Sequence, residues 1–585
     1  MGYAHEYADA VLYRGRVPME PADFVPDWPD GPRRGKFYPG VESYALPDGD
    51  DLADAPAWAG LLPRSCGRPA AAGPAGSPGS AGSPGSAGSP GSAGSPGSPG
   101  SPGSPGGFTL PLLSAMLKDS YGLTGRRLGI QANSDLSGLP FYTHANWSRG
   151  TAGGGGLYPV GVYWASGPSG PLTPGIHYYD VQRHAVQRLL TGDVTARVRE
   201  ALGRDAPAEA LETDQYLILG VKYWQTAFKY NSFGYHVVCT DVGTLVQTWR
   251  IWAAAHGLRT APVLWFDEPR LNGLLGTVGE EEGVFAVVPL RWDGDGTVPR
   301  TAVGAGPDPA VRPYARVAGV DGPDPGVRHR DVERSRTVIE FPTVLAMHAA
   351  AVAGAADRPA PGALAPAAAR SVPAGATRVP LPAPAFPEVP VRRVLRSRRS
   401  SFGRFDAADP VTPGQLSSVL AACAAASLGG EADPDGALRQ VRLYAFVNHV
   451  RDIVPGAYVY DPEAGDLALV VPGPQGAFLQ ENYFLANYNL EQAGVVLVPT
   501  VRTKAVLDAV GDRGYRLAVG TAGAVAQTFY LAASALSLGA GVALGFDNVS
   551  FVERLGLEGT AEAPLLIMPL GNERPEPADF RHEIA

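Results

Sequence analysis

The sequence predicts an α+β protein that contains two copies of one domain. The first observation is an internal repeat, because Gly234–Asp267 aligns without a gap on Gly514–Asp547, 280 residues further on. The second is that both copies mix helical periodicity with short strand patterns. The third is a length of 585 residues, which is more than one hydrophobic core usually serves. Two copies in one polypeptide indicate a covalent pseudo-dimer, with any ligand site at the joint between them.

The repeat rests on identical residues at equal positions of the two copies. They include the pairs Gly234/Gly514, Tyr235/Tyr515, Gly243/Gly523, Gln247/Gln527 and Phe266/Phe546. Further upstream the offset is 281 residues, as Tyr163 and Tyr444 show. The copies differ most where chemistry would be located, and those differences are informative.

Composition excludes several classes of protein. A chain with 45 % apolar and 18 % charged residues is typical of a globular protein, and a net charge of −9 gives no general footprint for nucleic acid or an anionic membrane. The three cysteines, Cys66, Cys239 and Cys423, form no CxxC pair, so neither a disulfide framework nor a metal site is predicted. The most apolar window, 522–546, contains polar residues and glycines and is interpreted as a buried helix rather than a membrane span. The start of the chain lacks the pattern of a signal peptide, so we expect a cytoplasmic protein.

Changes in composition divide the chain into five segments. Residues 1–66 are expected to form an N-terminal arm rich in Tyr, Trp, Pro and acids, and residues 67–107 a flexible low-complexity linker of GSPGSA type. The two domains are predicted at 108–300 and 389–585. A Pro/Ala-rich connection, 301–388, lies between them, with room for one helix over 335–353.

The local patterns place helices and strands in both domains. Asp241–His256 has apolar residues at three- to four-residue spacing and ends at Gly257, which predicts a helix. Other predicted helices are Ser114–Tyr121, Gln415–Ala426 and Thr521–Leu538. The strands are predicted to be few and scattered, at Val160–Ala165, His177–Tyr179, Phe285–Pro289, Arg442–Val447, Ala457–Tyr460 and Leu565–Pro569.

Three motifs could carry chemistry. The arginines and serines of Arg396–Arg404 suit a phosphate group, although a solvated basic run is the alternative. The four glycines of Gly150–Pro159 allow the backbone to approach a flat ligand, although a plain turn would look the same. The pair Lys229-Tyr230 offers two groups that can exchange protons, although a surface lysine beside a packed tyrosine is the simpler interpretation.

The repeat adds information on these motifs. At the positions of Lys229 and Tyr230 the second copy has Ala509 and Val510, which cannot titrate. The glycine loop maps to residues 434–440, which have lost most of the glycines, and no Arg-Arg-Ser element begins the first copy. Each half therefore keeps what the other lacks, as expected when a two-site dimer is fused and one shared site survives.

At these residues the chain resembles the nitroreductase superfamily and, within it, the SagB-type azoline dehydrogenases. Those enzymes use FMN to oxidise thiazolines or oxazolines of ribosomally made peptides to thiazoles or oxazoles. The resemblance covers roughly 110–291 and 389–575 and includes part of the N-terminal arm. It implies two tandem FMN-dependent nitroreductase-like domains in one pseudo-dimer.

The resemblance also implies roles for particular residues. Those expected to bind FMN are Arg398, Arg399 and Ser400 at the phosphate, Leu544 and Gly545 near flavin N5, Arg574 as a C-terminal contact, and Gly153, Gly154 and Gly155 of the first half against the ring. Lys229 and Tyr230 are the expected catalytic pair, one of them a base with a lowered pKa. The family's Pro-Ser before the glycines is Ala152-Gly153 here, a departure from its pattern. The opposite site is expected to be empty.

The implied substrate is a modified precursor peptide, and a cyclodehydratase or leader-peptide-binding protein is the expected partner. Two other functions are compatible with the sequence, a general FMN nitro- or quinone reductase that uses NAD(P)H, and a non-catalytic scaffold of a peptide-modifying complex. The sequence leaves open the choice between thiazoline and oxazoline, the electron acceptor, further oligomerisation and the role of the N-terminal arm.

Overall fold

The structure is a computed structural model, and it describes residues 2–49, 51–62, 106–130, 142–293, 325–373, 375–401, 403–432, 438–574 and 581–583. All but the last two residues of the predicted linker, 67–107, lie outside these ranges. The first part of the predicted connection, 301–324, also lies outside them. The same holds for residues 433–437, which include part of the segment that the repeat aligns with the glycine loop.

Each half of the chain is organised around an antiparallel sheet. The first sheet has six strands in the order β1-β6-β5-β4-β7-β8. Its strands are β1 (Ser43–Ala45), β4 (Val160–Ser166), β5 (Gly175–Asp180), β6 (Ala185–Thr191), β7 (Gln215–Lys222) and β8 (Glu282–Pro289).

The second sheet has eight strands in the order β14-β16-β13-β10-β11-β12-β9, with β15 paired to β13. Its strands are β9 (Arg378–Pro380), β10 (Val441–Val447), β11 (Gly456–Asp461), β12 (Asp466–Pro472), β13 (Val495–Val501), β14 (Gly539–Ala540), β15 (Ala563–Pro564) and β16 (Met568–Gly571). A small third sheet is formed by β2 (Gly125–Ile130), β3 (Tyr142–Ser148) and β17 (Arg581–Glu583).

The two large sheets repeat one topology. The path β6-β5-β4-β7-β8 of the first sheet corresponds to β12-β11-β10-β13-β16 of the second. The register repeats as well, because Tyr163 pairs with Tyr178 and, 281 residues on, Tyr444 pairs with Val459. The predicted α+β class and the internal repeat are therefore confirmed.

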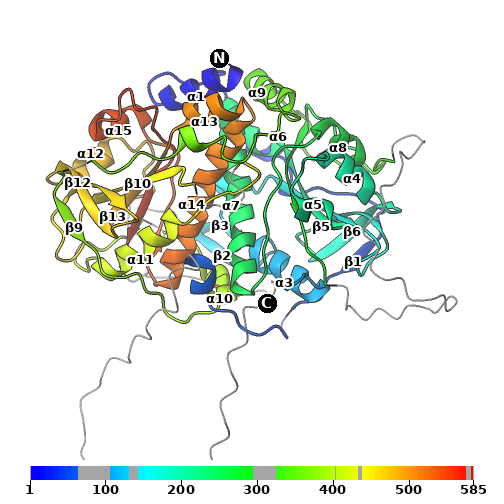
Figure 1. Cartoon of the computed structure of the whole chain (residues 1–585), viewed down its shortest axis with the longest axis horizontal. Coiled ribbons are helices and arrows are strands. Elements are labelled where there is room, and N and C mark those ends of the chain that lie inside the picture. The colour runs from blue at the N-terminus through cyan, green and yellow to red at the C-terminus, as the bar shows by residue number, and fades with distance from the viewer. Residues whose placement is uncertain are drawn as a thin grey trace, which may run out of the picture.

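Two long helices join the halves. α7 (Gly234–Ala255) and α14 (Gly514–Ala535) run side by side through the middle of the molecule (Figure 1), with a sheet on either side. α14 is long and apolar enough to cross a membrane, but 94 % of its most apolar window is buried inside the molecule. It is the central core helix, as predicted for this window.

The remaining helices cover the sheets and the ends of the central pair. In the first half and the connection they are α2 (Trp58–Leu61), α3 (Leu110–Ser120), α4 (Thr195–Leu202), α5 (Ala208–Leu211), α6 (Tyr223–Tyr230), α8 (Glu268–Leu275) and α9 (Pro342–Ala353). In the second half they are α10 (Val391–Ser397), α11 (Pro413–Ala424), α12 (Gly476–Glu481), α13 (Thr503–Val510) and α15 (Asn548–Leu555). α1 (Tyr3–Tyr13), from the N-terminal arm, crosses to α9, α13 and α15 at one end of the central pair (Figure 1).

Three expectations about the elements were wrong. The strands are not few and scattered, because β7 and β13 are buried on both faces and their apolar runs show no alternation. α7 begins at Gly234 rather than Asp241, since its first turns are buried against neighbouring elements that outweigh the low helix propensity of glycine. Of the strand expected at Leu565–Pro569, only Met568 and Pro569 lie in a strand, β16, and Leu565–Ile567 connect β15 to it.

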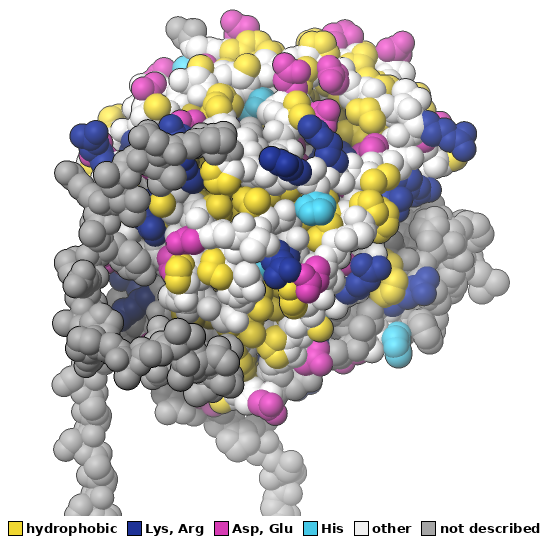
Figure 2. Space-filling view, turned by 90° about the vertical axis from the view of Figure 1, so that its right-hand side faces the viewer, with side chains coloured by type: hydrophobic (Ala, Val, Ile, Leu, Met, Phe, Trp, Pro, Cys, Tyr) yellow, Lys and Arg dark blue, Asp and Glu magenta, His cyan; other side chains and the backbone are white. Residues whose placement is uncertain are grey.

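The outer face of the first half carries mixed charge. In the view turned by 90° from Figure 1, basic and acidic side chains are interspersed among apolar and polar ones (Figure 2). Among the described residues on this face, charge of one sign does not gather into a large patch.

Candidate active site

A cavity of about 670 Å³ lies between the two halves. The first half lines it with its glycine loop, the end of α6 and one face of α7, and the second half with residues 400–401, 485–488 and 542–545. The N-terminal arm contributes Arg14, which directly follows α1. Segments that are hundreds of residues apart in the chain therefore meet at one site, at the joint where the pseudo-dimer was expected to place it.

The glycine loop packs closely against its neighbours at Gly154 and Gly155. Gly155 and Gly156 have φ values of +59° and +68°. A β-carbon on Gly154 would lie 2.4 Å from a methyl carbon of Val237, and one on Gly155 would lie 2.5 Å from Lys229 Nζ. This loop is thus a fitted wall of the cavity rather than a plain turn.

Lys229 and Tyr230 end α6 and both line the cavity. Lys229 Nζ lies 5.1 Å from the centroid of the Tyr230 ring. Burial, together with the charge of Arg34, lowers the pKa of Lys229. Burial and then the charge of Asp241 raise the pKa of Tyr230, contrary to the expectation that either group could have a lowered value. Lys229 is therefore the better base, and Tyr230 keeps its proton and can donate it.

Asp241 is a cavity residue that the sequence reasoning missed. Its Oδ1 accepts a hydrogen bond of 2.7 Å from the N–H of Gly154, and its Oδ2 is buried without a partner among the described residues. Burial raises the pKa of Asp241 to about 7, although the bond from Gly154 opposes the shift. The repeat could have indicated Asp241, because the second copy has Thr521, which cannot carry a charge, at this position.

The second half supplies hydroxyl groups and backbone. Ser400 Oγ and Tyr530 Oη lie 2.9 Å apart in the cavity wall, and Leu544 and Gly545 line the cavity beside them. Asn487 of the loop that follows α12 completes this side.

The structure places the predicted arginines at different distances from this cavity. Arg398 is buried, donates to the carbonyl of Arg149 and has its guanidinium carbon 5.3 Å from the Tyr530 ring centroid. Arg399 pairs with Glu573 at 2.7 Å, and the exposed Arg574 donates its backbone N–H to the Arg404 carbonyl. The structure therefore gathers Gly153, Gly154, Gly155, Lys229, Tyr230, Ser400, Leu544 and Gly545 in the cavity wall, whereas Arg398, Arg399 and Arg574 lie behind it.

Comparison with known proteins gives the family. The sequence pattern of the nitroreductase family matches residues 395–572. A "putative nitroreductase" of Methanocaldococcus jannaschii is 30 % identical over 198 residues, which is 32 % of this chain and 94 % of that protein. The chain belongs to the nitroreductase family.

Solved structures of nitroreductase-family proteins show the same fold. A "putative nitroreductase" from Anabaena variabilis superposes with a TM-score of 0.66 at 20 % identity, over 98 % of this chain and 100 % of that one. The whole two-domain arrangement, and not one half alone, therefore has a counterpart in that structure. A chain of the E. coli microcin synthetase McbBCD complex matches 30 % of this chain with a TM-score of 0.26, which carries no argument about substrate.

In this nitroreductase-family chain the pseudo-symmetric counterpart of the cavity, at Leu264 and Trp265, is closed. The backbone N–H groups of Leu264 and Trp265, which correspond to those of Leu544 and Gly545, donate to the carboxylate of Glu431 at 2.9 and 3.0 Å. Glu431 is only 5 % exposed. Because its carboxylate accepts from both groups, these two N–H groups are not available to a ligand.

Metal chemistry has no support in the described ranges, where no group of three or more His, Cys, Asp or Glu side chains could hold an ion. Cys239 and Cys423 are both buried, and burial raises the pKa of each thiol. Lys229, Tyr230 and Asp241 are titratable side chains of the first half that line the cavity.

Proposed function

We propose that the chain binds one FMN between its halves and oxidises azoline rings of a modified precursor peptide to azoles. The observation that carries this proposal is that Lys229, a base with a lowered pKa, lies in the same cavity as the Ser400 and Leu544–Gly545 elements of the other half.

The residues present fit FMN. The glycine loop leaves room for a flat ring system, because Gly156 lines the cavity and has nothing within 4 Å of where a β-carbon would lie. Behind Ser400, the Nε atoms of Arg398 and Arg404 are buried without a hydrogen-bond acceptor in the part of the chain that the structure describes. Guanidinium groups with unused donors suit a phosphate. Ser400 and Arg398 would hold the phosphate, and Leu544 and Gly545 would face the ring.

Aromatising an azoline removes a hydride and a proton from adjacent ring atoms. FMN, when bound, would accept the hydride. Lys229 Nζ would take the proton, since burial favours its neutral form. Tyr230, whose pKa burial raises, would hold its proton and orient the ring through a hydrogen bond.

The first test is the visible spectrum of the purified full chain with its flavin-to-protein ratio, where we expect one FMN per polypeptide. The second is Lys229→Ala, which removes the base. It should lower turnover of an azoline peptide by about 10²–10⁴-fold and leave the flavin ratio unchanged. Lys504→Ala, at an exposed lysine paired with Asp9, is the matched control and should keep full turnover. Full turnover in Lys229→Ala would reject the role of Lys229.

An FMN nitro- or quinone reductase that uses NAD(P)H is the second candidate, because the similar proteins are described as nitroreductases. Rapid bleaching of the bound flavin by NADPH without oxygen, together with no azoline turnover, would favour it. A colourless protein would favour the scaffold instead. A peptide substrate further implies a cyclodehydratase or leader-peptide-binding partner, which a pull-down with the precursor peptide would test.

A further inference from the structure

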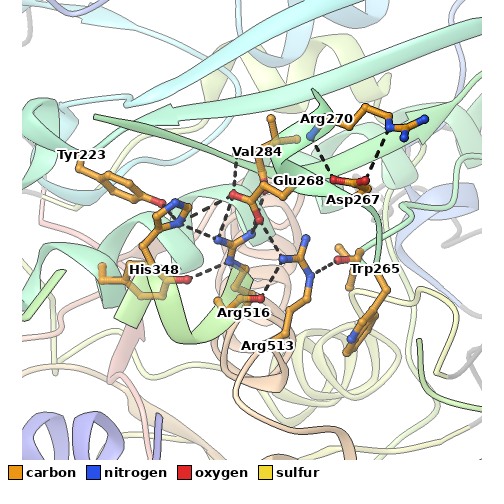
Figure 3. A network of polar contacts seen from close by, with 12 residues as sticks. Tyr223, Trp265, Asp267, Glu268, Arg270, Val284, His348, Arg513 and Arg516 are labelled. Atoms are coloured by element: carbon orange, nitrogen blue, oxygen red, sulfur yellow. Dashed lines mark hydrogen bonds and ion pairs between the residues drawn. The ribbon is translucent and has the colours of Figure 1, made fainter. Parts of the chain in front are cut away.

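In the closed counterpart of the cavity, arginines of the second half hold the loop that contains Leu264 and Trp265. Arg513, at the start of the second half's central helix, donates from Nε to the carbonyl of Leu264 at 2.6 Å and from Nη1 to Glu268 at 2.8 Å (Figure 3). Arg516 also donates to Glu268, at 2.9 Å. One buried carboxylate therefore anchors two arginines, and one of these fixes the loop carbonyl.

At the cavity, the residues that correspond to Arg513 and Glu268 are of other types. By the 280-residue offset, Phe233 stands at the position of Arg513, and Asn548 stands at the position of Glu268. The replacement of Glu268 by Asn548 goes together with a difference at a third position, Val284 in the first copy and Pro564 in the second. Glu268 accepts from the N–H of Val284. Proline has no N–H, and Asn548 instead donates to the carbonyl of Pro564.

Arg14 takes the place of the missing arginine. It donates to the carbonyl of Leu544 and, at 2.8 Å, to Oδ1 of Asn548, which are the counterparts of two of the acceptors used by Arg513. Its guanidinium carbon lies 4.4 Å from the centroid of the Phe233 ring, the residue that replaced Arg513. Arg14 of the N-terminal arm thus makes the contact with Leu544 that Arg513 of the second half makes with Leu264.

The closed place and the cavity differ in their counter-charges. Glu268 offsets one of the two positive charges of Arg513 and Arg516. Asn548 is uncharged, and Asp547, which directly precedes it, pairs with Arg16 at 3.2 Å. Arg14 lines the cavity together with Lys229 and Asp241, and burial lowers the pKa of Arg14 only to about 10, so that it remains charged at neutral pH. Arg14 therefore places at the cavity wall a positive charge that has no carboxylate within ion-pair distance among the described residues, although the charge of Asp547 favours its protonated form.

We propose that Arg14 makes the N-terminal arm part of the active site, as a positioning residue that holds the Leu544–Gly545 loop and whose uncompensated charge stabilises negative charge on the bound cofactor. The proposal rests on the proposed function, since it takes FMN as that cofactor. Acceptance of a hydride adds one negative charge to a flavin, so a nearby cation should favour the reduced form.

The test is the midpoint potential of FMN bound to the full chain. Arg14→Gln should weaken binding of reduced relative to oxidised FMN by about tenfold, which lowers a two-electron midpoint by about 30 mV. Asn548→Asp keeps Arg14 but gives it a carboxylate partner, and should lower the midpoint in the same direction. Arg183→Gln removes an equal charge from an exposed pair with Asp180, outside the cavity lining, and should leave the midpoint unchanged. An unchanged midpoint in Arg14→Gln, or an equal fall in Arg183→Gln, would overturn the electrostatic role.

A second readout needs no flavin. Hydrogen–deuterium exchange of the backbone around residues 542–548 should become faster in Arg14→Gln, because the Leu544 carbonyl loses its donor, and should not change in Arg183→Gln. Unchanged exchange in Arg14→Gln would overturn the positioning role. A wild-type chain that binds no FMN would reject the proposed function, and the exchange measurement would still decide whether Arg14 holds the loop.

Discussion

A β-carbon on Gly243 would lie 2.0 Å from the carbonyl oxygen of Gly520, so the central helices touch backbone to backbone at this point. The symmetric contact has the same form. Gly523, the repeat partner of Gly243, would place a β-carbon 2.2 Å from the carbonyl of Thr240, the repeat partner of Gly520. The two contacts mark the pseudo-twofold axis, and they require glycine at an identical position of both copies.

Gly243→Ala should therefore destabilise the joint between the halves. Alanine favours a helix over glycine by about 1 kcal/mol, but a carbon forced against a carbonyl oxygen typically costs about 1–3 kcal/mol or more. We expect a lower midpoint in urea denaturation. Gly273→Ala is the matched control, because this α8 glycine has nothing within 4 Å of a β-carbon, and it should be neutral or slightly stabilising. Equal midpoints for the two variants would show that the helices can separate at little cost.

The sequence predicted the parts of the fold that depend on local pattern and on the repeat. It located the cores of α7 and α14, where apolar residues recur with helical periodicity, and it also located the strands β4 and β10. It missed β7 and β13, since a strand buried on both faces shows only an apolar run.

The candidate site was predictable only in part. Lys229 and Tyr230 stood out because Ala509 and Val510 replace them in the other copy. The same comparison, Asp241 against Thr521, could have found Asp241, but a single carboxyl on a helix carries no motif. Arg14 and Glu431 could not have been found in this way, because their roles depend on contacts with residues far away in the chain.

Gly155 and Gly156 make a matched pair for testing the glycine loop. Both have left-handed φ values, so alanine at either should cost about 1–2 kcal/mol of backbone strain. Only at Gly155 would the new carbon also meet Lys229 Nζ and Tyr230 Oη, each at 2.5 Å, whereas Gly156 has open space. Gly155→Ala should reduce azoline turnover by about 10²-fold through displacement of the pair, and Gly156→Ala much less. Steady-state rates at equal flavin loading would compare them, and equal losses would show that backbone strain alone matters.

Asp241 should make the stability of the protein depend on pH. Burial raises its pKa from 3.8 to about 7, so between these values the folded protein keeps a proton that the unfolded chain releases. Stability should therefore fall as pH rises through this window, by an amount on the order of 4 kcal/mol, and the loss should be complete above about pH 7.

Asp241→Asn removes this titration and still provides an oxygen for the Gly154 N–H. Its free energy of unfolding relative to wild type should rise by several kcal/mol between about pH 5 and pH 8. Asp205→Asn, at an exposed position, should show no such trend. A constant difference between Asp241→Asn and wild type would mean that the carboxyl is ionised at low pH.

Glu268 should be the most important single charge at the joint. It is fully buried and shared by Arg513 and Arg516 of the second half, with His348 of α9 beside it at 3.8 Å (Figure 3). Burial alone would raise the pKa of Glu268, but the two arginines and His348 outweigh it and lower the value to about 2. Glu268→Gln leaves two buried guanidinium groups without an anion, so it should cost about 3–5 kcal/mol.

The pH dependence distinguishes this charge effect from a packing effect. Because the pKa of Glu268 is lowered from 4.5 to about 2, its stabilisation is present above about pH 4.5 and is lost as pH falls toward 2. The gap between wild type and Glu268→Gln in urea denaturation should therefore narrow as pH is lowered from about 5 to 3. Glu553→Gln breaks the exposed pair with Arg16 and should cost less than about 1 kcal/mol. A gap for Glu268→Gln that stays constant with pH would assign its cost to shape rather than to charge.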